Sequence, residues 1–200
     1  MGRPREHDET TRTALLGAAE RIVAAGGPGA LSVRSVAEAA GTTTRAVYSL
    51  FGSKDGLLAE ALAGDAFEFL SEEIDKLSET DDPASDLVDV GVLVFRRLAR
   101  EHPALYRIAF QRIVPLEAGP ELTAARQQAW GRLVHRIERL ETAGLLGQKT
   151  VTEAAIEFNA MMEGLANAEL RGAVLRLLPA GSEEATWRSA LRTVIRGFTS

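Results

Sequence analysis

The sequence predicts an all-α protein of about nine helices. Apolar residues recur at spacings of three and four along most of the 200-residue chain, which is the spacing of one face of an α-helix. No stretch alternates apolar and polar residues as a half-buried β-strand does, and aromatic residues make up only 6% of the chain. Glycine and proline separate the periodic segments, because neither residue continues a helix well. These observations favour a bundle of helices over a fold built on sheets.

Three helices are predicted in the N-terminal quarter. Residues 1–9 are polar, and we expect them to form a flexible arm. A first helix follows over about residues 10–25 and ends at the sequence GGPG. Ser32 is placed to cap a second helix, because apolar residues follow it with helical spacing. Gly41 ends that helix, and a third is predicted over about residues 43–51.

Six further helices are predicted in the rest of the chain. Ser53 is placed to cap a fourth, which extends to about Leu77, and Thr80–Pro83 gives the strongest linker signal. The others are recognised by capping residues or prolines at their starts. They run from Ser85 or Asp86 to His102, from Pro103 through Phe110, from Pro120 to Gly144, from Thr150 (with Glu153 at capping-box spacing) to about Leu178, and from Ser182 through Phe198.

Charge is distributed unevenly along the chain. The net charge is −5, yet residues 1–54 carry seven basic and five acidic side chains, whereas residues 55–200 carry 16 basic and 23 acidic ones. This asymmetry indicates a basic working end on an acidic body.

Composition and motifs disfavour several classes of protein. The chain has no cysteine, so it has no disulfide framework, no cysteine-based zinc site and no thiol nucleophile. No apolar run approaches the ~18–20 residues of a membrane span, and residues 1–12 do not resemble a signal peptide. We therefore expect a cytoplasmic protein without a membrane partner. G-x-S-x-G, G-x-G-x-x-G, H-E-x-x-H and the Walker loop are absent, so we expect neither an enzyme nor a bound cofactor or metal.

Residues 31–62 have the pattern of a helix-turn-helix, in which two short helices are joined by a tight turn that contains glycine. The second helix of such a unit enters the major groove of DNA. At about 100° per residue, the helix over residues 43–51 has an apolar arc, formed by Ala46, Val47, Leu50 and Phe51, and a polar arc, formed by Thr44, Arg45, Tyr48 and Ser49. Hydroxyl groups suit contacts with phosphates, and arginine can read guanine through O6 and N7.

The segment GTTTRAVYSLFGSKDGLL resembles the recognition-helix signature of the TetR family of transcriptional regulators. That signature combines a Gly-x-Ser/Thr turn, an aliphatic-Tyr pair, a Phe three residues after the Tyr, and Ser-Lys-acid before the next helix. Here it falls on Gly41, Thr43, Val47, Tyr48, Phe51, Ser53, Lys54 and Asp55. The specific part of the match covers about residues 10–62. The chain departs from the signature at Leu50, where many members carry His, and at Arg45, where a small residue is common.

The resemblance implies a DNA-binding domain over residues 10–56 and a ligand-binding and dimerisation domain over residues 57–200. It also implies the DNA contacts. It would place Thr43, Thr44 and Arg45 in or beside the major groove, and Arg34, Tyr48 and Lys54 at backbone phosphates. The N–H groups and positive dipole end of the fourth helix would support the phosphate at Lys54. Arg3 and Arg5 of the arm can reach an adjacent groove.

The later helices predict a small-molecule site and a dimer interface. Pockets between bundle helices are apolar with a few polar anchors; the candidate lining residues are Phe95, Leu98, His102, Tyr106, Phe110, Trp130, Phe158 and Met162. Plain core packing explains the same apolar residues equally well. The helix over residues 150–178 is apolar almost all round, which is typical of a helix buried on several sides. We predict that it and the last helix pair with their copies in a two-fold homodimer.

The sequence therefore favours a TetR-like regulator that binds a near-palindromic operator in double-stranded DNA as a homodimer. Release by a small, largely apolar effector would make it a repressor, the commoner outcome in the family, while activation remains open. The alternative is a helical small-molecule or lipid carrier without DNA binding. That alternative explains the apolar later helices but leaves the surface of Thr44, Arg45, Tyr48 and Lys54 without a purpose.

Overall fold

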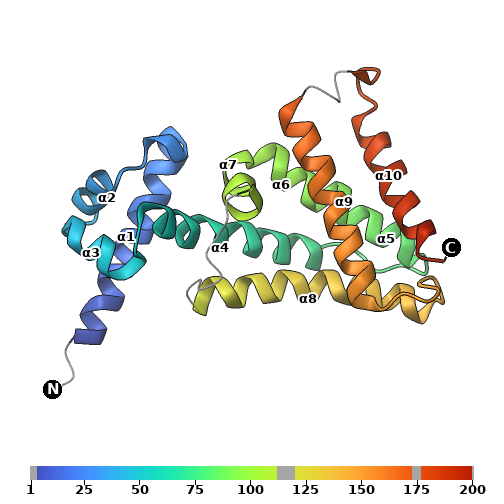
Figure 1. The fold of residues 1–200 in the computed structure, drawn as a ribbon, viewed down its shortest axis with the longest axis horizontal. Helices are drawn as coiled ribbons and strands as arrows, with labels where there is room; N and C mark the ends of the chain where they lie inside the picture. The colour runs from blue at the N-terminus through green and yellow to red at the C-terminus, as the bar shows by residue number, and fades with distance from the viewer. Residues whose placement is uncertain (1–3, 112–119, 173–176, 200) are drawn as a thin grey trace. The chain divides into compact units, whose positions relative to one another are not determined.

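The computed structural model describes residues 4–111, 120–172 and 177–199, and these residues form helices and turns with no β-strand among them (Figure 1). In chain order the elements are α1 (Pro4–Gly26), the 3-10 helix η1 (Pro28–Ala30), α2 (Val33–Ala39), α3 (Thr44–Phe51), α4 (Lys54–Asp75), α5 (Pro83–Asp89), the π-helix η2 (Val90–Phe95), α6 (Arg96–Glu101), α7 (Pro103–Tyr106), the π-helix η3 (Arg107–Gln111), α8 (Pro120–Thr142), α9 (Val151–Arg171) and α10 (Glu183–Gly197). We count α5, η2 and α6 as one helix and α7 and η3 as another, because each follows directly on the last. With η1 left aside, the described residues then form the nine expected helices. In this described part, no helix is long and apolar enough to cross a bilayer.

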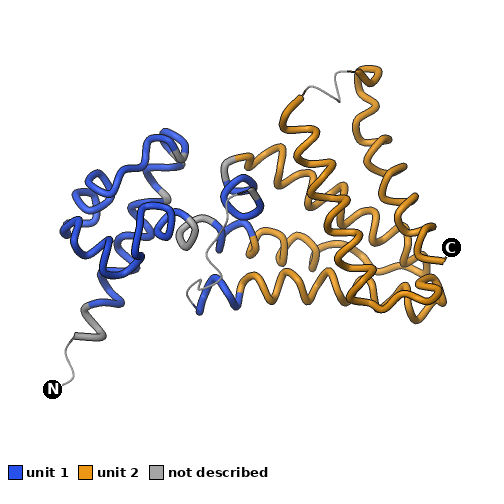
Figure 2. Tube along the Cα trace, in the orientation of Figure 1, with its two compact units in different colours: residues 1–66, 104–124 blue, residues 67–103, 125–200 orange. Residues whose placement is uncertain are grey.

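The chain divides into two compact units (Figure 2). The first comprises the described residues of 1–66 and 104–124, and the second those of 67–103 and 125–199. Within the first unit, α1 contacts α2 and α3, and α2 contacts α3. Their core contains Leu15, Val36 and Val47, which are completely buried. Apolar burial among three helices therefore gives the N-terminal helices a core of their own.

In the second unit, η2 continues α5 into α6, and this continuous helix contacts α9 and α10, which also contact each other. Gly91 of η2 is buried, and a Cβ atom at this position would lie only 2.4 Å from Cδ1 of Leu191 on α10. The same Cβ would lie 3.4 Å from Sδ of Met162 on α9. The absence of a side chain at Gly91 thus allows three helices to approach closely.

Several predicted helix starts are confirmed by their capping hydrogen bonds. The hydroxyl of Ser53 accepts the N–H of Gly56 at 2.9 Å at the start of α4. Thr150 and Glu153 form a capping box at the start of α9, where Thr150 accepts the Glu153 N–H at 3.2 Å and Glu153 accepts the Thr150 N–H at 2.8 Å. These starts were predictable because each cap involves residues three positions apart.

Two predicted helix starts were wrong. Helix α1 begins at Pro4 and not near residue 10, so residues 4–9 of the expected arm are helical; proline suits the first turn because that turn needs no intrahelical donor. Helix α5 begins at Pro83 and not at Ser85 or Asp86, because Asp82 accepts the Ser85 N–H at 3.0 Å.

The end of α9 and the cap of α10 also differ from the prediction. Helix α9 stops at Arg171 and does not continue towards Leu178, because Gly172 adopts a left-handed conformation with φ 68°. Ser182 precedes α10 as predicted, but its hydroxyl makes no capping bond and instead donates to the carbonyl oxygen of Pro179 at 2.7 Å.

Candidate nucleic-acid interface

The turn between α2 and α3 is fixed by local hydrogen bonds. At the start of α2, the hydroxyl of Ser32 accepts the N–H of Ser35, and the hydroxyl of Ser35 accepts the N–H of Ser32, both at 3.0 Å. At its end, Gly41 has φ 66°, and the N–H of Thr42 donates to the carbonyl oxygen of Ala37 at 2.9 Å. This Schellman closure ends α2 at a defined residue. The pair α2 and α3 therefore forms the predicted helix-turn-helix.

Helix α3 has one buried face and one exposed face. Val47 is completely buried and Phe51 is nearly so, whereas 56% of Tyr48 is exposed. The other fully outward side chains are Thr44, Arg45 and Ser49. The predicted division of this helix is confirmed, and its outer face presents hydroxyl groups, a phenol and one guanidinium.

Thr43 has a structural task at the start of α3. Its side-chain oxygen accepts the N–H of Ala46 at 3.3 Å, so it satisfies one of the backbone donors that a helix start leaves unpaired. The side chain is exposed. Of the residues predicted at the major groove, Thr43 is thus the one that also caps the helix.

The end of α3 is held in place by two contacts that the sequence did not reveal. The guanidinium of Arg12 on α1 lies 5.0 Å from the ring centroid of Phe51, a cation–π contact. Gly52 turns the chain with φ 68°, and a Cβ atom at Gly56 would lie 2.1 Å from the carbonyl oxygen of Phe51. Glycine at position 56 is therefore required for the close approach of α3 and α4.

Two of the three predicted phosphate contacts, Arg34 and Lys54, lie at helix starts. Lys54 is the first residue of α4, directly after the capping Ser53, and its side chain is half-buried. Arg34 is exposed on the second residue of α2. A helix N-terminus favours an anion through its free N–H groups and its dipole. Arg3 and the side chain of Arg5 lie outside the described residues.

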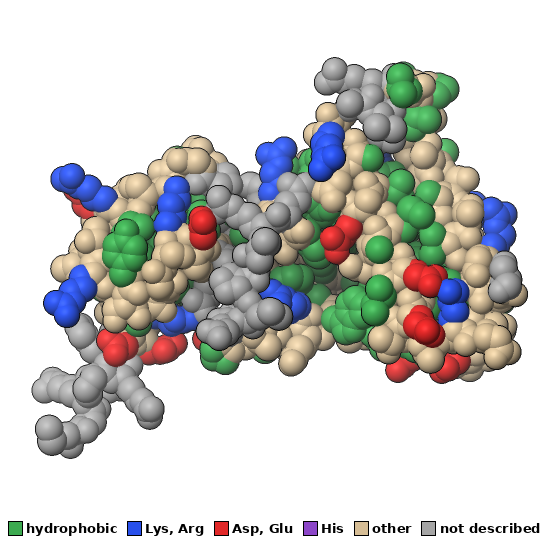
Figure 3. Space-filling view, viewed as in Figure 1, with side chains coloured by type: hydrophobic (Ala, Val, Ile, Leu, Met, Phe, Trp, Pro, Cys, Tyr) green, Lys and Arg blue, Asp and Glu red, His purple; other side chains and the backbone are tan. Residues whose placement is uncertain are grey.

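The cations of the two units differ in their surroundings. Among the described residues, the side chains of Arg34, Arg45 and Lys54 have no hydrogen-bond or ion-pair partner, and Figure 3 shows Lys and Arg side chains projecting from the surface over α2 and α3. Most arginines of the second unit instead bind carboxylates. These pairs include Arg96–Glu169 at 2.9 Å, Arg132–Asp75 at 2.7 Å, Arg139–Asp86 at 2.6 Å and Arg188–Asp89 at 2.7 Å. Only the unpaired cations are free to neutralise phosphates without first breaking an ion pair.

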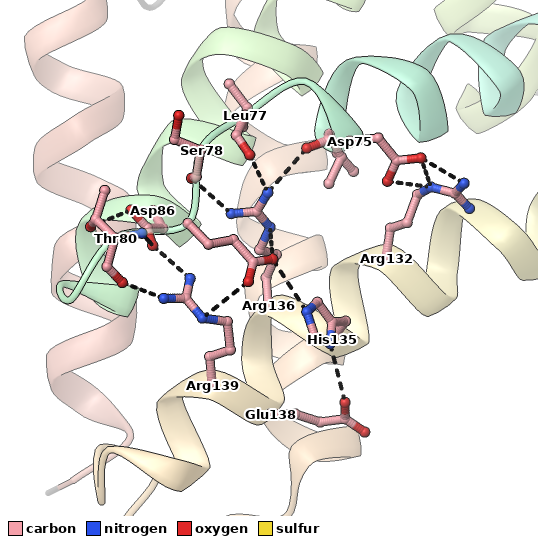
Figure 4. A network of polar contacts seen from close by, with 12 residues as sticks. Asp75, Leu77, Ser78, Thr80, Asp86, Arg132, His135, Arg136, Glu138 and Arg139 are labelled. Carbon is pink, nitrogen blue, oxygen red and sulfur yellow. Dashed lines mark hydrogen bonds and ion pairs between the residues drawn. The ribbon is translucent and has the colours of Figure 1, made fainter.

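A polar network in the second unit joins α8 to the segment after α4 (Figure 4). Thr80 donates through its N–H and its hydroxyl to the carboxylate of Asp86, at 2.7 and 2.8 Å. Arg139 also contacts Asp86, and it donates to the carbonyl oxygen of Thr80. Burial raises the pKa of Asp86, but hydrogen bonds from Arg139 and Thr80 outweigh burial and leave the pKa below its ordinary value. The segment predicted as a linker, Thr80–Pro83, is thus held within one unit by side chains.

The predicted effector-site residues are not all gathered in one place. Phe95, Leu98, Phe158 and Met162 are buried in the second unit. Tyr106 is buried and stacks on Phe110 with ring centroids 5.2 Å apart, and both belong to the first unit. Two residues expected to point inward, His102 and Trp130, are exposed. Trp130 points outward because its neighbour Ala129 occupies the buried row of α8, and adjacent helical positions differ by about 100°.

An effector could also be anchored by polar side chains of the later helices, and the sequence offers Gln111, Arg112, His135, Asn159 and Glu163. Asn159 donates to Glu163 at 2.7 Å, and His135 lies 3.2 Å from Glu79. Arg112 and the side chain of Gln111 lie outside the described residues. Among the residues that the structure describes, no group of three or more His, Asp or Glu side chains is arranged to hold a metal ion.

Comparison with known proteins gives two matches to family models. Residues 15–61 match the model of bacterial regulatory proteins of the tetR family, and residues 91–194 match the model of tetracyclin repressor-like C-terminal domains. No curated protein matches the chain.

Solved structures share the fold. A protein of unknown function from Rhodococcus sp. RHA1 superposes with a TM-score of 0.71 at 21% identity, covering 95% of this chain and 96% of its own. RolR, solved in complex with resorcinol, gives a TM-score of 0.69 at 18% identity and covers 98% and 95%. The TetR family regulator PfmR from Thermus thermophilus gives 0.58 at 22% identity and covers 91% and 97%.

Proposed function

Because this chain belongs to the TetR family of DNA-binding transcriptional regulators, we propose that it represses transcription as a homodimer on a near-palindromic operator and leaves the DNA when a small effector binds. We assign DNA binding to residues 10–56, and effector binding and dimerisation to residues 57–200. The protein would act in the cytoplasm, without catalysing a reaction and without a cofactor. The observation that carries the proposal is the outward face of α3 with the unpaired Arg45, together with the unpaired cations Arg34 and Lys54 at the starts of α2 and α4 in the described structure.

The proposed DNA contacts divide by chemistry. Thr44 and Arg45 lie in the first turn of α3, the part of a recognition helix that reaches base edges. Tyr48 stands one turn further along the same face, where a phenol can donate to a phosphate oxygen. Arg34 and Lys54 supply charge at the starts of α2 and α4. Thr43 joins this surface through its exposed side chain while it caps α3.

The proposed dimer uses α9 and α10. Helix α9 buries one row of side chains, among them Phe158 and Met162, against its own unit. Its other side exposes Ile156, Ala160 and Gly164 at spacings of four residues, and Ile156 is 56% exposed. A row of small residues beside an exposed isoleucine suits close packing against another helix. A two-fold axis at this face would present two copies of α3 to successive turns of DNA.

The proposed effector is small and largely apolar, because the buried candidates for its site are Phe95, Leu98, Phe158 and Met162. The resorcinol bound by RolR, a protein of the same fold, is of this size. His102 and Trp130 are left out of the site because their side chains are exposed. Helix α4 contains residues of both units, so an effector that prefers one position of α4 would shift the population of DNA-binding dimers.

A gel-shift experiment with the DNA upstream of the protein's own gene tests the proposal. We expect a complex that survives an excess of unrelated duplex, a footprint with two-fold symmetry, and a dimer by light scattering. A panel of small phenols and aliphatic compounds, resorcinol included, should contain a member that dissociates the complex. The alternative function, a carrier without DNA binding, predicts that the same panel binds but that no duplex is retained.

A further inference from the structure

Arg45 is the one charged residue of α3, and its guanidinium, which only donates hydrogen bonds, restricts the base that it can read. We infer that Arg45 contacts a guanine in each operator half-site through O6 and N7; this inference rests on the proposed DNA binding. Arg45 is the second residue of α3 and is exposed. Its guanidinium has no partner among the described residues, so no internal ion pair competes with a base.

The other outward side chains of α3 do not select one base. The oxygen of Thr43 already accepts the Ala46 N–H. Hydroxyl groups, such as those of Thr44 and Ser49, both donate and accept, and so they match either kind of base edge. A guanidinium only donates, through a rigid planar fork. In the major groove, guanine alone offers two neighbouring acceptors, O6 and N7, since adenine presents an amino donor beside its N7. Arg45 is therefore the residue that can discriminate.

The test uses the duplex that the wild-type chain selects from a randomised pool, together with duplexes in which each base pair is replaced in turn. Replacing that G·C pair by A·T in one half-site should weaken wild-type binding by about 5- to 150-fold. Arg45→Ala should bind the original and the replaced duplex equally well. Arg45→Lys should keep part of the affinity and only part of the discrimination, because an ammonium also donates to O6 and N7 but lacks the planar fork. The matched control is Arg107→Ala, which removes an exposed and unpartnered cation of η3 in the described structure.

Two results would overturn the inference. Arg45→Ala could retain the wild-type preference at every position, which would assign base reading to other residues. It could instead weaken binding to all duplexes equally, which would make Arg45 a phosphate contact. Failure of the proposed function would give a different result, because the wild-type chain and Arg107→Ala would then both select no sequence at all.

Discussion

Arg136 of α8 donates a hydrogen bond at 2.8 Å to the carbonyl oxygen of Leu77, two residues after the end of α4, and so caps the C-terminal end of that helix. The same guanidinium binds the carbonyl oxygens of Ile74 and Ser78 at 3.1 and 3.2 Å (Figure 4). The last carbonyls of a helix lack partners within it, and the helix dipole favours a cation there. Since only 4% of the Arg136 side chain is exposed, this arginine is a buried cap supplied by a distant part of the sequence.

Replacing this cap should destabilise the fold. We expect Arg136→Met to lower the free energy of unfolding by about 2–4 kcal/mol, because it removes the guanidinium that binds the partly buried carbonyl groups of Leu77 and Ser78. Urea denaturation followed by circular dichroism measures the loss. The matched control is Arg132→Met, which removes a partly exposed pair with Asp75 and should cost less than about 1 kcal/mol. Equal losses for the two variants would refute the capping role.

Stability should fall in acid partly through Asp86. Its pKa is lowered in the folded state, so it stabilises the fold above the pKa of the unfolded chain, near 3.8. That stabilisation is lost as the pH drops through the lower folded-state pKa. Denaturation measured from neutral pH down to about pH 3 should show a smaller acid loss for Asp86→Asn than for the wild type. If Asp86→Asn instead loses as much stability in acid as the wild type, the assignment is wrong.

Gly56 should tolerate no side chain. The Cβ atom of Gly56→Ala would meet the carbonyl oxygen of Phe51 at 2.1 Å, so we expect a loss of about 1–3 kcal/mol in unfolding free energy together with weaker DNA binding. Gly64 lies in the same helix with open space at its Cβ, and Gly64→Ala should raise stability by up to about 1 kcal/mol. Thermal denaturation and gel shifts of both variants distinguish the close approach at Gly56 from a general effect of alanine in α4.

The dimer face should be sensitive to charge. A Cβ atom at Gly164 on α9 meets nothing within 4 Å in its own chain, so Gly164→Glu should leave the monomer folded and separate the dimer. Light scattering should then give about the 21.5 kDa of one chain, with DNA affinity reduced. Gly131→Glu, at an equally open glycine on α8, is the control and should stay dimeric. A dimeric Gly164→Glu protein would place the interface elsewhere.

Local interactions explain what could be predicted from the sequence. Ser32, Ser53 and Thr150 cap helices through bonds that span three residues, and the two faces of α3 follow from helical periodicity within nine residues. The boundaries that were wrong have local causes as well. Asp82 competes with Ser85 as the cap of α5, and Gly172 ends a helix whose apolar pattern continues beyond it.

Long-range contacts explain what could not be predicted. Glu169 accepts hydrogen bonds from Arg96, 73 residues away, and from the indole N–H of Trp187 at 2.8 Å. A charged residue on an apolar helix gives no sign of which partner will bury it. The same holds for Arg136, whose sequence context is that of an ordinary solvated helix face, and for Trp130, whose size suggested burial although it is exposed.

The salt dependence of DNA binding is the most direct test that the outward face of α3 and the start of α4 bind DNA. We propose that Tyr48 and Lys54 contact phosphates, and each neutralised phosphate steepens the fall of log affinity with log salt by about 0.9. For the double variant Tyr48→Phe, Lys54→Ala, fluorescence anisotropy on the operator across a series of salt concentrations should show weaker binding. Because the homodimer loses the Lys54 charge from both subunits, the slope should be shallower by about 1.8. Identical affinity and slope for variant and wild type would contradict it.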